Sequence, residues 1–185
     1  MDETNQEIKN TIDNAEEEVQ KLITEFDNGK LIPLPGRTVQ ETLELRILEA
    51  LNRARNKSGD VAMRQVRVSS AITLARCGAR GNPLNIAQMS AVVGQQALRG
   101  KRIDHGFKNR TLSYFEKGDL SPKSRGFIRN NFKSGLAPHE FFFGAMTGRD
   151  ALMDTALRTP KSGYLYRRLS NAMQDLKVEY DSSVR

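Results

Sequence analysis

Apolar residues recur near the start of the chain in alternating steps of four and three positions. They are Ile8, Ile12, Ala15, Val19, Leu22 and Phe26. This spacing places them along one side of a helix, as in the seam of a coiled coil, and predicts a helix over residues 4–27. Asn28 and Gly29 follow, and both tolerate the positive φ that is typical of a helix end.

A second helix is predicted to begin near Thr38, after a connection that contains two prolines. Thr38 and Glu41 have the spacing of a capping box, in which each side chain accepts a hydrogen bond from the other residue's backbone N–H. Apolar residues with the same four-three-four spacing follow at Leu43, Ile47, Ala50 and Ala54. Two such seams joined by a short turn predict an antiparallel helical hairpin. The pattern is compatible with a structural role and with a projecting docking arm.

The middle of the chain has weaker periodicity. Residues 56–60 interrupt the helical pattern, and a further helix is predicted over 60–77. Asn82 as an N-cap and Pro83 in the first helical position predict a short helix over 83–93. Residues 94–135 are rich in Gly, Lys, Arg, Asn and Ser, so we expect a long loop with short extended or helical pieces. Such a loop is unusual in a small independent domain and implies support from another structure.

The last long helix is predicted to begin at Pro138 and to extend to about Lys177. Pro160 and Gly163 lie in its middle. An interior proline has no N–H for the carbonyl four residues earlier and crowds that carbonyl, at a cost of about 3 kcal/mol or more. Two interpretations follow: two helices separated by a break, or one helix with a functional kink.

Composition and charge narrow the functional class. The 185 residues favour one domain, or a small domain with an appendage. Residues 1–28 hold nine acidic and two basic residues, a net charge of −7, so the remainder carries +14. A strongly basic body suggests an anionic partner, of which nucleic acid is the commonest, although a solvated basic surface has the same composition. No apolar run is long enough for a membrane span and the N-terminus is polar, so we expect a cytoplasmic protein.

Residues that carry out bond chemistry are sparse. His105 and His139 are far apart, and the single Cys77 excludes an internal disulfide. No phosphate-binding glycine loop and no aspartate cluster for two Mg²⁺ ions is visible. Asp150 and Asp154 are one helical turn apart and are interpreted as salt-bridge partners of nearby arginines. We therefore expect no catalysis by the chain alone.

Residues 155–173 combine positive charge with small, hydroxyl and tyrosine residues and contain no acid. Small residues permit close approach, tyrosine offers a stacking surface for bases, and arginine makes forked contacts with phosphate. This composition suits a helix that lies against a nucleic acid without reading its sequence. A solvated helix face is the alternative interpretation.

A longer pattern carries a resemblance. The stretch GLAPHEFFFGAMTGRDALMDTALRTPKSGYLYRRL (135–169) closely resembles the bridge helix of the largest subunit of multisubunit DNA-directed RNA polymerase. GARGNPLNIAQMSAVVGQQALRGKRI (78–103) and RTLSYFEKGDLSPKSRGFI (110–128) also match this family in order. The triple Phe (141–143) and the GKRI segment resemble archaeal and eukaryotic forms more than bacterial ones, and an archaeal form is preferred. The helical hairpin lies where the family has its funnel, the rim of the secondary channel. The match begins and ends inside the subunit, so we expect a piece of a longer protein.

The resemblance implies a mainly α fold: the funnel hairpin, shorter helices, a long irregular region, and a C-terminal bridge helix kinked near Pro160. It implies a funnel-like helical domain over 1–93, a connecting segment over 94–135, and the bridge helix with its extension over 136–185. It also implies two sets of site residues. The template-contacting set is Thr155, Ala156, Thr159, Pro160, Gly163, Tyr164, Arg167 and Arg168, and the nucleotide-path set is Arg80, Asn85 and Gln88.

In the family this helix supports translocation and nucleotide addition, a nucleotidyltransferase activity of the assembled enzyme. The family uses Mg²⁺, whose aspartate ligands are outside this chain, so no metal is expected here. The implied partners are other polymerase subunits, template DNA, nascent RNA, nucleoside triphosphates and a transcript-cleavage factor at the funnel, with no membrane. The alternatives are an independent basic helical nucleic-acid-binding module and a docking protein that uses the acidic hairpin.

Two residues depart from the family pattern. Pro160 stands where relatives usually have a small residue, which predicts a bent or broken helix at the template-facing step. Ala137 stands where relatives often have Thr, so the capping box at the start of the bridge helix loses its hydroxyl, at a cost of about 0.5–2 kcal/mol. We therefore expect this helix end to fray in isolation.

Overall fold

The computed structural model describes residues 2–65, 69–104 and 106–185, and it is mainly helical, as predicted. The chain divides into two compact units, Met1–Ala145 and Met146–Arg185. The first contains the hairpin, the irregular segment and the start of the last helix. The second contains the remainder of that helix and the C-terminal residues. The division into 1–93, 94–135 and 136–185 stays a prediction.

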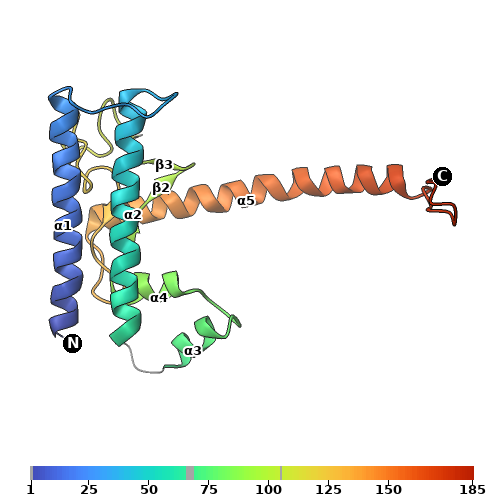
Figure 1. Ribbon diagram of the computed structural model, residues 1–185, viewed down its shortest axis with the longest axis horizontal. Coiled ribbons are helices and arrows are strands. Elements are labelled where there is room, and N and C mark those ends of the chain that lie inside the picture. Colours follow the sequence, from blue (N-terminus) through green and yellow to red (C-terminus); the bar gives the residue numbers. More distant parts are fainter. Residues whose placement is uncertain (1, 66–68, 105) are drawn as a thin grey trace. The chain divides into compact units, whose positions relative to one another are not determined.

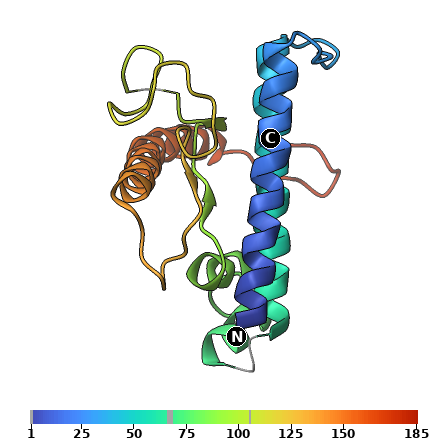
Figure 2. The ribbon, with the colours of Figure 1, turned by 90° about the vertical axis from the view of Figure 1, so that its left-hand side faces the viewer.

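Helices α1 (Asp2–Asp27) and α2 (Val39–Gln65) form the predicted antiparallel hairpin (Figures 1 and 2). The two seams face each other and form the main core. Their buried members are Ile8, Ile12, Ala15, Val19, Leu43, Ile47, Ala50 and Ala54. The capping box is confirmed, because the Thr38 N–H donates to Glu41 at 3.1 Å and the Glu41 N–H donates to the Thr38 hydroxyl at 3.2 Å. Hydrophobic burial along both seams therefore holds the hairpin together.

The predicted interruption at 56–60 is wrong, because α2 continues through these residues to Gln65. Ser58 and Gly59 are buried and allow close packing. A Cβ at Gly59 would lie only 2.9 Å from the Cβ of Ala87. The glycine therefore allows the helix that contains Ala87 to pack closely against α2, and it does not terminate α2. The predicted helix over 60–77 is therefore replaced by the end of α2 and the separate α3 (Ser70–Arg76), and residues 66–68 lie outside the described residues.

Helix α4 (Pro83–Ser90) begins as predicted, with the Asn82 side chain accepting from the Leu84 N–H. It ends before the predicted residue 93 because the chain turns to pair with a distant segment: the Val93 N–H donates to the Asn130 carbonyl at 3.0 Å. Strand β1 (Gly94–Gln95) then pairs antiparallel with β4 (Phe127–Ile128). Strands β2 (Ala97–Leu98) and β3 (Lys101–Arg102) pair antiparallel with each other.

Between α4 and α5 the described part of the chain is irregular apart from the short strands, as the predicted long loop with short extended pieces requires, and the chain itself supports it. The Arg102 guanidinium, whose side chain is 1% exposed, binds both carboxylate oxygens of Glu44 on α2, at 2.6 and 2.9 Å. Phe127 lies in the same core as the hairpin seams. The expected support therefore comes from α2, since a buried two-point ion pair and an aromatic anchor hold the loop to it.

Helix α5 (Pro138–Met173) is continuous through Pro160. Of the two interpretations, one long helix is confirmed, and two helices separated by a break is wrong. The proline removes one donor, that for the Ala156 carbonyl, while the turns on both sides keep their helical conformation. Whether α5 bends at Pro160 stays a prediction. After α5, Val178 and Val184 form an isolated antiparallel bridge that closes a short C-terminal turn.

Candidate functional site

The part of α5 beyond residue 150 has no buried face in its own unit. Every side chain from 151 to 178 is exposed. The exposed apolar members are Leu152, Met153, Leu157, Tyr164, Leu165, Tyr166, Leu169, Met173, Leu176 and Val178. Leu157 is 70% exposed and Tyr166 is 74% exposed. Helices in water normally derive their stability from burying an apolar face, so this helix has the surface of an element that packs against other molecules.

The eight predicted template-contacting residues fall into two neighbouring rows on α5, because residues four apart lie one above the other on a helix. One row is Thr155, Thr159, Gly163 and Arg167, and the other is Ala156, Pro160, Tyr164 and Arg168. Each row begins with small or hydroxyl residues and ends in an arginine. This side of α5 therefore carries mainly short side chains in its first two turns and two positive charges, Arg167 and Arg168, at its end.

Local contacts fix several of these side chains. The Thr155 hydroxyl donates to the Ala151 carbonyl at 2.9 Å, and the Thr159 hydroxyl donates to the Thr155 carbonyl at 2.8 Å. Both oxygens keep lone pairs for an outside donor. The Arg168 guanidinium lies 5.0 Å from the centre of the Tyr164 ring, a cation–π contact. Charge and stacking surface are thus combined at the end of the second row.

The interpretation of Asp154 as a salt-bridge partner is confirmed. Its carboxylate lies 2.8 Å from the Arg158 guanidinium, one turn along α5. Both side chains are largely exposed, so the pair contributes little to stability. Asp154 and Arg158 neutralise each other, whereas Arg167 and Arg168 lie in a stretch without acids.

Glu140 anchors the start of α5 and was not recognised from the sequence. It is only 4% exposed, and its carboxylate accepts from the backbone N–H groups of Ala137 (2.8 Å) and Arg129 (3.0 Å). The Asn130 side-chain amide donates to it at 2.8 Å. Burial alone would raise the pKa of Glu140, but these hydrogen bonds favour the charged form and lower the pKa below its ordinary value.

The expected loss of the capping box at this helix is therefore only partial. Ala137 has no hydroxyl to cap the helix, but Glu140, three residues later, still reaches back to the Ala137 N–H. The additional donors from residues 129 and 130 hold the carboxylate in place. A capping box involves only residues within one helical turn, so the donors ten and eleven positions before Glu140 have no counterpart in that local pattern.

Arg129 extends this anchor to α1. Its guanidinium forms ion pairs with Asp13 and with Glu16, the latter at 3.0 Å. Burial raises the pKa of Glu16, the Arg129 charge counteracts that effect, and neighbouring Asp13 adds to the increase. The only sequence signal for these contacts was the excess of acids in residues 1–28.

Aromatic packing completes the base of α5. Phe143 is fully buried and its ring stacks with that of Phe115, with centroids 6.3 Å apart. The His139 ring stacks on Tyr114 at 6.1 Å. His139 therefore has a packing role, and His105 lies outside the described residues.

The predicted nucleotide-path residues lie in the turn after α3 and on α4. Arg80 is exposed in the turn after α3. A Cβ at Gly81 would lie 3.9 Å from the Asn85 side-chain amide, so this turn lies beside α4. Gln88 is one turn after Asn85 on α4 and is partly buried. Their role stays a prediction.

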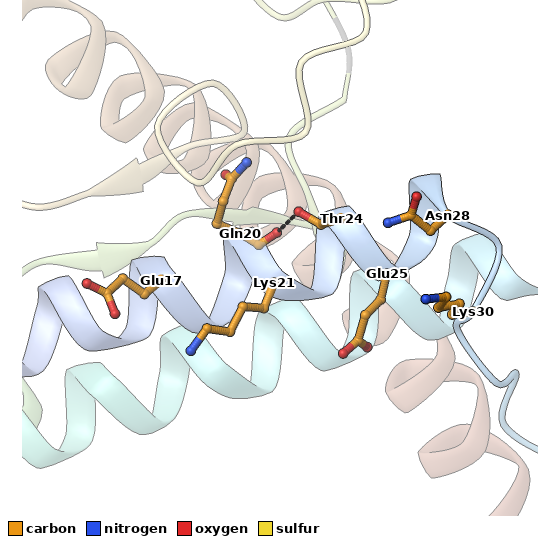
Figure 3. A pocket seen from close by; sticks show the side chains of 7 residues that line it. All are labelled: Glu17, Gln20, Lys21, Thr24, Glu25, Asn28 and Lys30. Carbon is orange, nitrogen blue, oxygen red and sulfur yellow. Dashed lines mark hydrogen bonds between the residues drawn. The ribbon is translucent and has the colours of Figure 1, made fainter.

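A surface hollow of about 620 Å³ lies along α1 and the following turn. Figure 3 shows the side chains that line it. They are those of Glu17, Gln20, Lys21, Thr24, Glu25, Asn28 and Lys30. All seven residues are exposed, and the Thr24 hydroxyl is already bonded to the Gln20 carbonyl at 2.8 Å. An open hollow with mixed charge and no enclosed polar group lacks the features of a small-molecule site.

Within the described residues, no group of three or more His, Cys, Asp or Glu side chains is arranged to hold a metal ion. In the same part of the chain, none of the helices combines the length and apolar character that crossing a membrane requires.

Comparison with known proteins accounts for nearly the whole chain. Residues 22–128 match the family description "RNA polymerase Rpb1, domain 4", and residues 135–185 match "RNA polymerase Rpb1, domain 5". DNA-directed RNA polymerase subunit Rpo1N of Thermococcus celer is 53% identical over 96% of the chain and 20% of its own length. The Rpo1N subunit of Halococcus morrhuae is 52% identical over 97% of the chain and 52% of its own length.

The same subunit of Methanocaldococcus jannaschii is 49% identical over the whole chain and 14% of its own length. The chain thus spans between about one seventh and about half of these relatives. All three are archaeal, in agreement with the archaeal resemblance of the motifs. The chain belongs to the family of the largest RNA polymerase subunit.

Proposed function

We propose that α5 is the bridge helix of a DNA-directed RNA polymerase and that it contacts the template strand beside the point of nucleotide addition. The two rows ending in Arg167 and Arg168 face the template. They support translocation and nucleotide addition by holding the template, and bond formation itself depends on groups outside this chain.

The observation that carries this proposal is the complete exposure of α5 beyond residue 150. A helix that exposes so many apolar side chains, together with an interior proline, is suited to burial within a larger assembly. The apolar residues suit contacts with other polymerase subunits. Arginine and tyrosine suit the phosphates and bases of nucleic acid.

The arrangement of the two rows on α5 supports the template strand as the partner of the side of the helix on which they lie. At Gly163 the helix backbone has no side chain in front of it, and a Cβ there would meet no other atom within 4 Å. Thr159 lies one turn before it in the same row, and its side chain is short. A flat base pair can therefore approach the helix closely here, while the arginines four residues further on reach phosphates.

The hairpin of α1 and α2 is proposed to be the funnel that borders the secondary channel. Nucleoside triphosphates would pass near Arg80, Asn85 and Gln88, and a transcript-cleavage factor would dock on the hairpin. The acidic character of α1 supports docking of a basic protein. Nascent RNA and the remaining subunits would complete the surroundings.

Mg²⁺ belongs to the assembled enzyme in this proposal. The described residues offer no carboxylate cluster for it, and Asp154 is committed to Arg158. The metal would supply charge neutralisation at the reacting phosphates. The contribution of this chain is to orient the template.

Photo-crosslinking in the assembled polymerase tests the proposal. A photoreactive amino acid at Thr159 should crosslink to the template base at the insertion site. The matched control is Lys161, which is equally exposed but lies about 200° around the helix. Equal crosslinking from both positions, or none from Thr159, would contradict the proposed orientation.

The alternative, an independent nucleic-acid-binding module, is supported only by the basic composition. It predicts that the isolated chain binds DNA with an affinity that falls steeply as salt rises. The polymerase proposal predicts weak binding by the isolated chain and stable copurification with other polymerase subunits.

A further inference from the structure

Arg129 and Glu140 join three parts of the first unit that are distant in sequence. The guanidinium of Arg129 contacts Asp13 and Glu16 on α1. Its backbone N–H donates to Glu140 in the first turn of α5 at 3.0 Å. One residue therefore binds α1 with its side chain and α5 with its main chain.

The two halves of this connection differ in environment. Glu140 is 4% exposed and is surrounded by neutral donors from Ala137, Arg129 and Asn130. The Arg129 side chain is 44% exposed, and Asp13 is 50% exposed. Exposed ion pairs contribute little to global stability. The ion pairs between Arg129 and α1 are therefore better suited to fixing the position of Arg129 relative to α1 than to stabilising the fold.

The hydrogen bonds to Glu140 explain how a movement of α1 would affect the start of α5. The N–H groups of Arg129 and Ala137 point to the two oxygens of the same carboxylate, so the end of β4 and the start of α5 share one acceptor group. Movement of Arg129 with α1 would misalign the first of these bonds. Glu140 would then have to move, or leave a buried N–H unpaired.

We propose that Arg129 is a positioning residue that, through Glu140, ties the first turn of α5 to α1. This inference rests on the proposed function in one respect. If α1 belongs to the funnel and α5 is the bridge helix, a displacement of α1 would shift the first turn of the bridge helix. Arg129 itself touches neither substrate nor template.

Hydrogen exchange on the full chain tests the connection. Arg129→Ala keeps the backbone donor but removes the contacts with α1, and it should speed exchange of the Phe141 to Phe143 amides about fivefold, the effect of a roughly 1 kcal/mol local change. The matched control is Arg53→Ala, which removes an ion pair at 3.0 Å between α2 and Glu18 on the same α1. The control should leave these amides unchanged.

A second variant guards against an indirect effect of the alanine. Asp13→Asn combined with Glu16→Gln leaves residues 129 and 140 intact and should reproduce the faster exchange. Adding Arg129→Ala to it should have no further effect, because both remove the same contacts. Additive effects, or equal effects of Arg129→Ala and Arg53→Ala on α5, would overturn the proposal.

The assembled polymerase separates this inference from the proposed function. With Asp13→Asn and Glu16→Gln in the largest subunit, the rate of nucleotide addition should fall while the KM for nucleotides stays the same. Altered exchange in α5 with unaltered addition would overturn the claim that the connection influences nucleotide addition, whereas loss of the Thr159 crosslink in the unsubstituted enzyme would overturn the proposed function. Unaltered exchange in α5 would overturn the connection itself.

Discussion

The Glu140 carboxylate and the Asn130 side-chain amide lie 2.8 Å apart, and this hydrogen bond links the start of the long helix to the strand end that precedes it by ten residues. Backbone N–H groups of Arg129 and Ala137 share the same carboxylate. A single buried acid thus organises the junction from which α5 emerges.

Replacing Glu140 with Ala should lower the free energy of unfolding by about 2–3 kcal/mol, because several buried donors lose their acceptor. Urea denaturation followed by circular dichroism measures this change. Glu17→Ala, at an exposed position of α1, is the control and should change stability by less than about 0.5 kcal/mol. Equal effects of the two substitutions would show that the Glu140 contacts are dispensable.

The low pKa of Glu140 predicts a dependence of stability on pH. Because the folded pKa lies below the unfolded value, the contribution of Glu140 is present above the unfolded pKa and is lost as pH falls through the folded pKa. Denaturant midpoints should therefore fall as pH drops below the ordinary glutamate pKa of 4.5, and less so in Glu140→Gln.

Other titratable groups share the cavity beside Glu140, namely Glu16, Lys123, Arg129 and His139. Glu16 has the opposite shift, so its contribution to stability is present at low pH and is lost as pH rises. Glu16→Gln separates the two effects. If Glu140→Gln retains the full pH dependence of the unsubstituted chain, the assignment to Glu140 is wrong.

Ala137→Thr should increase the free energy of unfolding by about 0.5–1.5 kcal/mol, because the hydroxyl completes the capping box with Glu140. Ala137→Val adds the same branched shape without the oxygen and should not stabilise the chain. Thermal unfolding of both variants measures the difference. A gain shared by Thr and Val would assign the effect to packing.

Gly59→Ala should destabilise the chain by about 1 kcal/mol despite the higher helix propensity of alanine, because the new Cβ would lie 2.9 Å from that of Ala87. Combining it with Ala87→Gly should recover most of the loss. Chemical denaturation of the two single variants and the double variant gives the coupling energy. Additive losses would show that these positions do not contact each other.

Pro160→Ala should restore the missing N–H and slow amide exchange around Ala156 to Gly163 by at least about tenfold, because an interior proline costs about 3 kcal/mol. The control Thr159→Ala retains the proline and should leave exchange fast. Within the proposed function, the more rigid helix should also slow translocation. Unchanged exchange would mean that the proline does not weaken this region.

The sequence alone determined the elements whose causes are local. Seam residues such as Val19 and Leu43 predicted the hairpin, because a repeating apolar side must be buried against another. Thr38 with Glu41, and Asn82 with Pro83, predicted two helix starts, because a cap needs only residues within one turn. The long motifs identified the family and the candidate residues on α5.

Only the tertiary structure decided the features that depend on distant partners. Residues 56–60 were interpreted as an interruption between two helices, but they lie inside α2, and Gly59 leaves the space that the opposing Ala87 requires. The capping box at the start of α5 was expected to be missing, but Glu140 still reaches the Ala137 N–H and also accepts from residues 129 and 130. Local patterns encode propensity, whereas burial and hydrogen bonding between remote segments determine which propensity prevails.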